Sequence, residues 1–174
     1  MKTETVDHQP IEILFSYTHA DEKLREQLES HLAALKRKKR IICWHDRYIR
    51  AGLTWRAQIN EHLDTADIII FLISPDFLNS DYCNNVEVRH ALKRSEKGDV
   101  CIVPVILRRS DWKGEVLGEF QALPCDAKPV VEWSDLDVAL YDVVKGLKEI
   151  IVEMEQARTC STLSLASTPH PVAS

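Results

Sequence analysis

The stretch D-I-I-I-F-L-I, residues 67–73, decides the fold of this 174-residue chain. Its six consecutive apolar residues show no alternation with polar ones, and four of them are Ile. Such a run predicts a strand that is buried on both faces, as in the centre of a parallel sheet. Ser74-Pro75 ends the strand, since proline cannot continue a central strand.

Further strands and helices alternate outward from this central strand in both directions. Apolar runs predict strands at residues 11–17, 41–44, 100–107 and 128–133, and Pro104 favours an edge position for the fourth strand. Leucines and valines at helical spacing predict helices near residues 24–35, 55–66, 88–95 and 136–154. We therefore expect an α/β, flavodoxin-like three-layer sandwich with a five-stranded, mostly parallel sheet and right-handed crossovers.

Length and composition fit a single globular domain. The chain weighs 19.9 kDa, is 45% hydrophobic and 28% charged, and carries a net charge of −5. These values exclude disordered, collagen-like and disulfide-scaffold classes, and they argue against a nucleic-acid binder. The basic run K-R-K-K-R, residues 36–40, closes a predicted helix, where cations suit the negative end of the dipole, so it does not by itself predict a nucleic-acid partner.

The cysteines and the two ends of the sequence indicate the cellular compartment and the domain organisation of the protein. The five cysteines show no C-x-x-C spacing, which is typical of free thiols in a reducing compartment. Residues 1–10 are polar and are expected to be disordered, with no secretory signal, and no apolar run is long enough for a bilayer, so we expect a cytoplasmic protein without membrane contact. Residues 11–155 form the predicted domain. The Ser/Thr/Pro-rich residues 156–174 predict a tail, or a linker to an effector or sensor domain after residue 174.

Ligands of open parallel sheets bind outside the carboxyl ends of the strands. Those ends are Tyr17-Thr18-His19, Trp44-His45-Asp46 and Ser74-Pro75. The chain has no G-x-G-x-x-G, phosphate-loop, H-E-x-x-H or G-x-S-x-G motif, and no acidic cluster that would make it a receiver domain.

Three segments lie at the predicted strand ends: F-S-Y-T-H-A-D at residues 15–21, W-H-D-R-Y-I-R-A-G at residues 44–52 and S-P-D-F-L-N-S-D-Y-C-N-N-V-E at residues 74–87. In this order and spacing they resemble the TIR (Toll/interleukin-1 receptor) family. The first looks like the first box of the family, the second like its second strand and BB loop, and the third like its serine-containing loop and glutamate-bearing helix. The residues of these motifs are closer to those of bacterial and microbial members than to those of animal receptors.

The resemblance implies one of two activities. Some TIR domains are adaptors that only self-associate, and others cleave NAD⁺ at the nicotinamide–ribose bond in immune or anti-phage-type signalling. Glu87 matches the catalytic glutamate of the latter. We expect an NAD⁺ nucleosidase that gives ADP-ribose or a cyclic ADP-ribose isomer, needs no separate cofactor or metal, and is activated by self-association through His45–Thr54. The alternatives are a non-enzymatic scaffold and an enzyme like a nucleoside 2-deoxyribosyltransferase.

The chemistry of Glu87 is reasonable without the resemblance. Nicotinamide leaves NAD⁺ as a neutral base, so the reaction needs no general acid, and one carboxylate can stabilise the ribosyl cation or attack it. The alternative is a capping box, because Asn84-x-x-Glu87 also fits a glutamate that reaches back to a backbone N–H.

The resemblance also implies substrate contacts around Glu87. We expect them at Tyr17, Thr18, His19, Asp46, Arg50, Trp55, Tyr82 and Cys83. Trp55 could stack on a ring of the dinucleotide or pack in the core, and His19 could simply be exposed at a helix start. Cys83 stands where the family often has Trp, so Tyr82 could supply the aromatic ring, and a structural thiol is the simpler role for Cys83. Arg50 replaces an acidic residue of some NAD-cleaving members and could hold a phosphate or contact a neighbouring subunit.

Overall fold

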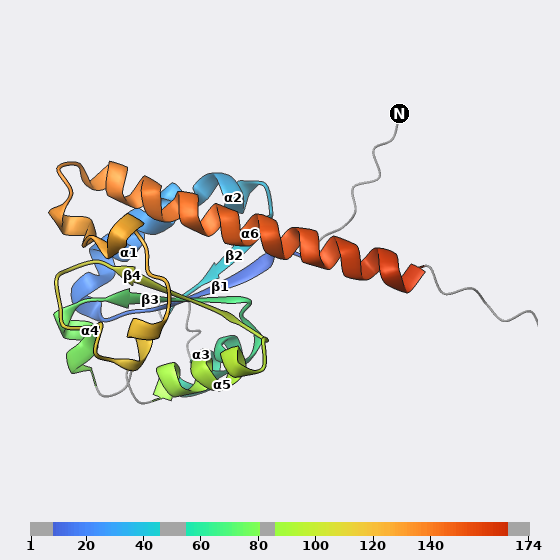
Figure 1. Ribbon diagram of the computed structural model, residues 1–174, viewed down its shortest axis with the longest axis horizontal. Coiled ribbons are helices and arrows are strands. Elements are labelled where there is room, and N and C mark those ends of the chain that lie inside the picture. Colours follow the sequence, from blue (N-terminus) through green and yellow to red (C-terminus); the bar gives the residue numbers. More distant parts are fainter. Residues whose placement is uncertain (1–8, 46–54, 81–85, 167–174) are drawn as a thin grey trace, which may run out of the picture.

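A parallel sheet of four strands forms the middle layer of the protein (Figure 1). The computed structural model describes residues 9–45, 55–80 and 86–166. The strand order is β2-β1-β3-β4, and all six residues of β3 are buried, as the sequence predicts for a central strand. The strands are β1 (Ile11–Ser16), β2 (Ile41–Trp44), β3 (Ile68–Ile73) and β4 (Cys101–Ile106).

Helices cover both faces of the sheet and complete the predicted three-layer α/β sandwich (Figure 1). Side chains of α1, α2 and α6 pack on one face, and those of α3 and α5 pack on the other. The helices are α1 (Glu22–His31), α2 (Ala33–Arg37), α3 (Trp55–Thr65), α4 (Pro75–Asn79), α5 (Val88–Glu96) and α6 (Leu136–Ala166).

Strand periodicity divides the residues of β1 between the two layers. Ile13, Phe15 and Tyr17 pack with α1 and α6, whereas Leu14 packs with α3 and α5. Because successive side chains of a strand point to opposite faces, Ser16 lies on the same face as Leu14. The last residue of β1 therefore points toward the layer that contains α5.

The predicted fifth strand, residues 128–133, is wrong. Val130–Glu132 form a 3₁₀ helix instead, within a segment that also holds the 3₁₀ helices Val116–Glu119 and Cys125–Ala127. Leu123 makes two backbone hydrogen bonds to β4, and Val131 makes one to Leu107. Pro124 and Pro129 lack the N–H that a continuous ladder needs, so the pairing stops there. Pro104 lies on the edge strand β4, as predicted.

A short helix follows β3 where the sequence predicted only a loop. Ser74 is the N-cap residue of α4, and its hydroxyl accepts a hydrogen bond from the Phe77 N–H at 3.1 Å. Pro75 occupies the first turn, where its missing N–H costs nothing. The sequence Ser-Pro-Asp carries this start signal in addition to ending the strand, because serine is a favoured N-cap residue and proline fits the first helical turn.

The final helix, α6, is longer than the predicted helix that ends near residue 154. It continues through Ala166, so residues 156–166 are helical although their composition suggested a linker. The hydroxyls of Thr159, Ser161 and Thr162 donate to carbonyls four residues earlier, which keeps them compatible with a helix. In the described part of the chain, no helix is long and apolar enough to cross a membrane.

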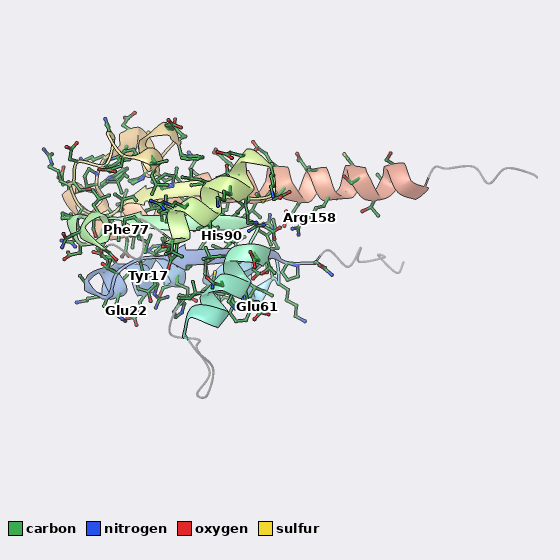
Figure 2. All side chains as sticks on the ribbon, turned by 90° about the horizontal axis from the view of Figure 1, so that it is seen from below. Tyr17, Glu22, Glu61, Phe77, His90 and Arg158 are labelled. Atoms are coloured by element: carbon green, nitrogen blue, oxygen red, sulfur yellow. The ribbon has the colours of Figure 1, made fainter. Side chains whose placement is uncertain are left out.

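Ion pairs tie α6 to the amino edge of the sheet. Arg158 pairs with Asp67 at 2.6 Å and donates to the Gln9 carbonyl at 3.0 Å. Arg40 pairs with Glu155 through two hydrogen bonds of 2.9 and 2.7 Å. Figure 2 shows Arg158 on the side of the molecule away from Tyr17 and Phe77, which lie near the carboxyl ends of the strands.

The 3₁₀ helix Val116–Glu119 offers a test of close backbone packing. A Cβ on Gly118 would lie 2.2 Å from the Lys113 carbonyl oxygen, whereas a Cβ on Gly114 would meet nothing within 4 Å. We expect Gly118→Ala to lower the free energy of unfolding by about 1–3 kcal/mol because backbone must move. Gly114→Ala should change it by less than about 0.5 kcal/mol. Urea unfolding measures both, and equal effects would contradict this account of the packing.

Candidate functional site

Buried polar side chains gather where the strands of the sheet end. In the described ranges, the polar or charged residues with less than a tenth of their surface exposed are Ser16, Asp21, Arg25, His45, Ser74 and Glu87. Each lies at the carboxyl end of a strand or in the first turns of the helix that follows. Burying polar groups is costly unless they are hydrogen-bonded, so their concentration here marks this edge as the candidate site.

Glu87 brings a carboxylate to this edge. It is the N-cap residue of α5, follows a π-helical Val86, and is only 5% exposed. Its side chain makes no capping hydrogen bond to α5. Instead, its Oε2 accepts a hydrogen bond from the hydroxyl of Ser16, which lies 71 residues earlier at the end of β1. Asn84, the other half of the possible capping box, lies outside the described residues.

A second carboxylate, Asp21, joins the ends of three strands. It is 1% exposed and accepts hydrogen bonds from Thr18 at 3.1 Å, from the Ser74 hydroxyl, and from Arg108 Nε at 3.0 Å. Arg108 also pairs with Asp76 at the start of α4. Three donors thus satisfy Asp21, and the cluster fixes η1 (His19–Asp21) against β3 and β4.

Tyr17 and His45 lie on the other face of this edge. Tyr17 is 9% exposed, and the guanidinium carbon of Arg25 lies 5.4 Å from the centre of its ring. The ring of His45 meets that of Tyr17 edge-on, with centres 6.5 Å apart. Tyr17 is therefore largely a packing residue between Arg25 and His45, and only a small part of it reaches the surface.

Arg25 is buried, and acidic neighbours balance its charge, although its Nε has no hydrogen-bond partner among the described residues. It is 2% exposed and pairs with Glu22 at 2.8 Å and with Glu29. Burial alone would lower the pKa of Arg25, but the hydrogen bonds of Glu22 and Glu29 and the charges of Tyr17 and Glu22 outweigh it and raise the pKa above its ordinary value. Burial likewise opposes ionisation of Glu29, yet Lys36 and Arg25 lower its pKa, so these groups stay charged.

Cys43, in strand β2, does not provide a nucleophile. Burial raises the pKa of its thiol to about 12, and the charge of Glu29 acts in the same direction. A thiol must ionise to attack, so Cys43 is inert near neutral pH. In the parts of the chain that the structure describes, no group of three or more His, Cys, Asp or Glu side chains could hold a metal ion.

The predicted site residues fall into three groups. Glu87, Tyr17 and Thr18 all lie at the carboxyl edge, but Tyr17 packs on the face of α1 while Glu87 bonds to Ser16 on the face of α5, and His19 is exposed on η1. Trp55 begins helix α3, but its side chain is not among those described. The remaining predicted contacts, Asp46, Arg50, Tyr82 and Cys83, lie outside the described residues.

The sequence alone did not reveal the side chains that hydrogen-bond to these residues and hold them in place. Ser16, Asp21, Ser74 and Arg108 carry the hydrogen bonds of the edge. Their positions at strand ends were the available signal, since a Ser that ends a buried strand must find a partner. The pairing of Ser16 with Glu87 across 71 residues could not be read from spacing.

Comparison with known proteins agrees with this architecture. A family model described as the TIR domain matches residues 13–137, which is most of the chain. The chain belongs to the TIR family. This family contains both NAD-cleaving enzymes and scaffold proteins.

Two relatives extend the comparison. The TIR chain is 40% identical over 162 residues to the uncharacterized protein y4lF of Sinorhizobium fredii (strain NBRC 101917 / NGR234), covering 93% of this chain and 50% of that protein. The chain thus spans about half the length of this curated relative. In structure it resembles the TIR domain of the Toll-related receptor TRR-2 from Hydra magnipapillata, with a TM-score of 0.56 and 20% identity. That match covers 79% of this chain and 96% of the other, and it shows a shared fold alone.

The hydrogen bonds of Asp21 with Thr18, Ser74 and Arg108, here the Asp21 cluster, predict a large loss of stability for a small change of the side chain. Asp21→Asn keeps the shape but removes the buried charge and turns an amide N–H₂ toward hydrogen-bond donors. We expect a loss of about 2–4 kcal/mol in the free energy of unfolding. Asp76→Asn breaks only a half-exposed pair with Arg108 and should cost less than about 1 kcal/mol. Urea unfolding distinguishes them, and a mild effect at Asp21 would mean that the cluster is not tightly coupled.

Proposed function

We propose that this TIR domain cleaves the nicotinamide–ribose bond of NAD⁺, with Glu87 as the catalytic carboxylate. The observation that carries the proposal is the position of Glu87. It is a buried carboxylate at the carboxyl edge of a parallel sheet, turned toward β1 rather than capping its own helix. An edge of this kind is where open α/β sheets bind ligands.

The reaction suits a single carboxylate. The bond between C1′ of the ribose and the pyridinium nitrogen breaks, and its electron pair goes to the departing nicotinamide. The ribosyl centre gains positive charge as the bond lengthens, and a fixed carboxylate stabilises it. Water then bonds to C1′ and releases a proton, which gives ADP-ribose, or a nitrogen of the adenine bonds to C1′ in place of water and gives a cyclic ADP-ribose isomer.

The start of α5 favours the ionised form of the carboxylate. Glu87 stands directly before the nine residues of α5, where the helix dipole presents its positive end. A carboxylate that stays ionised suits a group that stabilises a cation, and it would not suit a general acid.

Other residues of the carboxyl edge are the proposed substrate contacts. Thr18 and the exposed His19 lie at the end of β1, next to the Asp21 cluster. Tyr17 offers only a small accessible part of its ring. We assign the remaining contacts to Asp46, Arg50, Trp55, Tyr82 and Cys83 on the basis of the family pattern.

Self-association is the proposed mode of activation. TIR domains commonly associate with one another, and we assign this role to the segment His45–Thr54. The segment directly follows β2 and therefore leaves the sheet at the same edge as Glu87. Its ten residues exceed the two to six that are usual for such a connection. By analogy with the family, the setting would be immune or anti-phage-type signalling in the cytoplasm.

Replacement of the proposed catalytic carboxylate tests the activity. Glu87→Gln should lower NAD⁺ cleavage about a hundredfold or more, since the charge that stabilises the transition state is lost. Glu96→Gln removes an exposed carboxylate from the other end of the same helix and should leave the rate unchanged. The measurement is NAD⁺ incubation at high protein concentration, with the products identified by mass.

Three outcomes separate the candidate functions. Equal rates for Glu87→Gln and the wild type would contradict the catalytic role of Glu87. Absence of cleavage in a folded, self-associating wild type would favour the scaffold function instead. Transfer of a deoxyribosyl group between bases, without NAD⁺ cleavage, would favour the transferase.

Activation by self-association makes the specific activity depend on concentration. We expect activity per molecule to rise with protein concentration, and Arg50→Glu to weaken this rise with little change in the melting temperature. Arg37→Glu makes the same charge change at an exposed position on α2 and serves as the control. A rate strictly proportional to enzyme over a hundredfold dilution, with a monomer in sedimentation throughout, would contradict this mode of activation.

A further inference from the structure

Ser16 is an unusual residue for its position in the sheet. It ends β1, is 3% exposed, and pairs in the sheet with Phe71 of the central strand. Its side chain lies on the face where Leu14 and Phe71 contribute to the apolar core against α3 and α5. A hydroxyl in such surroundings needs a hydrogen-bond partner inside the protein, because water does not reach it.

The carboxylate of Glu87 is that partner. Ser16 Oγ donates to Glu87 Oε2, and both residues are almost fully buried. The bond joins a strand of the sheet to the first residue of a helix in the outer layer. Since strand backbones in a packed parallel sheet are rigid, a donor fixed on β1 restricts the carboxylate to one orientation.

We propose that Ser16 is a positioning residue, which holds the Glu87 carboxylate in its reactive orientation and in its ionised form. Ser16 is almost fully buried and donates to Glu87, so it acts through Glu87. The catalytic meaning of this role rests on the proposed NAD⁺ cleavage. The effect of the Ser16 hydroxyl on the orientation and ionisation of the buried Glu87 carboxylate does not depend on that activity.

A second hydroxyl–carboxylate pair at the same edge shows how Ser16 differs from a purely structural serine. Ser74 donates to Asp21 and also accepts the capping bond of Phe77 in α4. Asp21 in turn receives Thr18 and Arg108, so its charge is balanced by a cation. Ser74 therefore belongs to a cluster that stabilises the fold, whereas Ser16 connects the sheet to the proposed reacting group.

The test uses the full 174-residue chain with variants at both serines. Ser16→Ala removes the hydroxyl, Ser16→Thr keeps it, and Ser16→Cys replaces it with a weaker donor of similar size. Ser74→Ala is the matched control, since it removes a buried hydroxyl from the other carboxylate. For each variant we would measure kcat and KM for NAD⁺, the melting temperature, and the titration of the Glu87 carboxyl carbon by NMR. The Glu87→Gln variant assigns that signal.

Ser16→Ala should lower kcat about tenfold or more while KM changes less than about threefold, because orientation matters most in the transition state. Loss of a donor to the charged form should raise the titration midpoint of Glu87 above that of the wild type. Ser16→Thr should recover part of both effects. Ser74→Ala should lower the melting temperature and leave the Glu87 titration unchanged.

The two proposals fail in different ways. If the wild type does not cleave NAD⁺ but Ser16→Ala shifts the Glu87 titration, the proposed function is wrong and the positioning role stands. If the wild type cleaves NAD⁺ while Ser16→Ala changes neither kcat nor the titration, the positioning role is wrong. If Ser16→Ala does not fold, the same comparison is made with Ser16→Cys, and wild-type behaviour of that variant in both measurements would overturn the inference.

Discussion

Burial of β3 on both faces is the constraint on which the rest of this structure depends. All six of its residues, Ile68–Ile73, are buried, and helices must cover both sides of the sheet to achieve this. Polar groups then have no place within the layers. They are confined to the two edges where the strands begin and end, since only there do loops and helix ends supply partners.

The two edges of the sheet hold their polar groups in different ways. At the amino edge, ion pairs of Arg158 with Asp67 and of Arg40 with Glu155 hold the long helix α6 against the strands. These pairs are partly exposed and each contributes little, so their role is to set the direction of the helix. At the carboxyl edge the polar groups are buried, and networks of hydrogen bonds compensate them.

Two clusters of buried polar side chains stabilise the carboxyl edge. Asp21 joins the ends of β1, β3 and β4, and Arg25 with its acidic neighbours lies beneath Tyr17 on the face of α1. Glu87 is held by the hydroxyl of Ser16 at the end of β1. Two clusters thus keep the edge rigid, and rigid surroundings are what a carboxylate needs if it is to act on a substrate in one orientation.

The sequence by itself determined the α/β class, the central strand, the family and Glu87 as the residue of interest, because each is carried by local periodicity or by a motif of contiguous residues. Tertiary structure alone decided that residues 130–132 are not a strand, that α6 runs through Ala166, and that Ser16 is the partner of Glu87. The first depends on which backbone groups lie beside β4, and the second on the contacts of Arg158 with Asp67 and with the Gln9 carbonyl, which join the C-terminal part of α6 to the sheet. The third joins residues 71 positions apart, and no local pattern encodes a contact that forms only when strand and helix pack together.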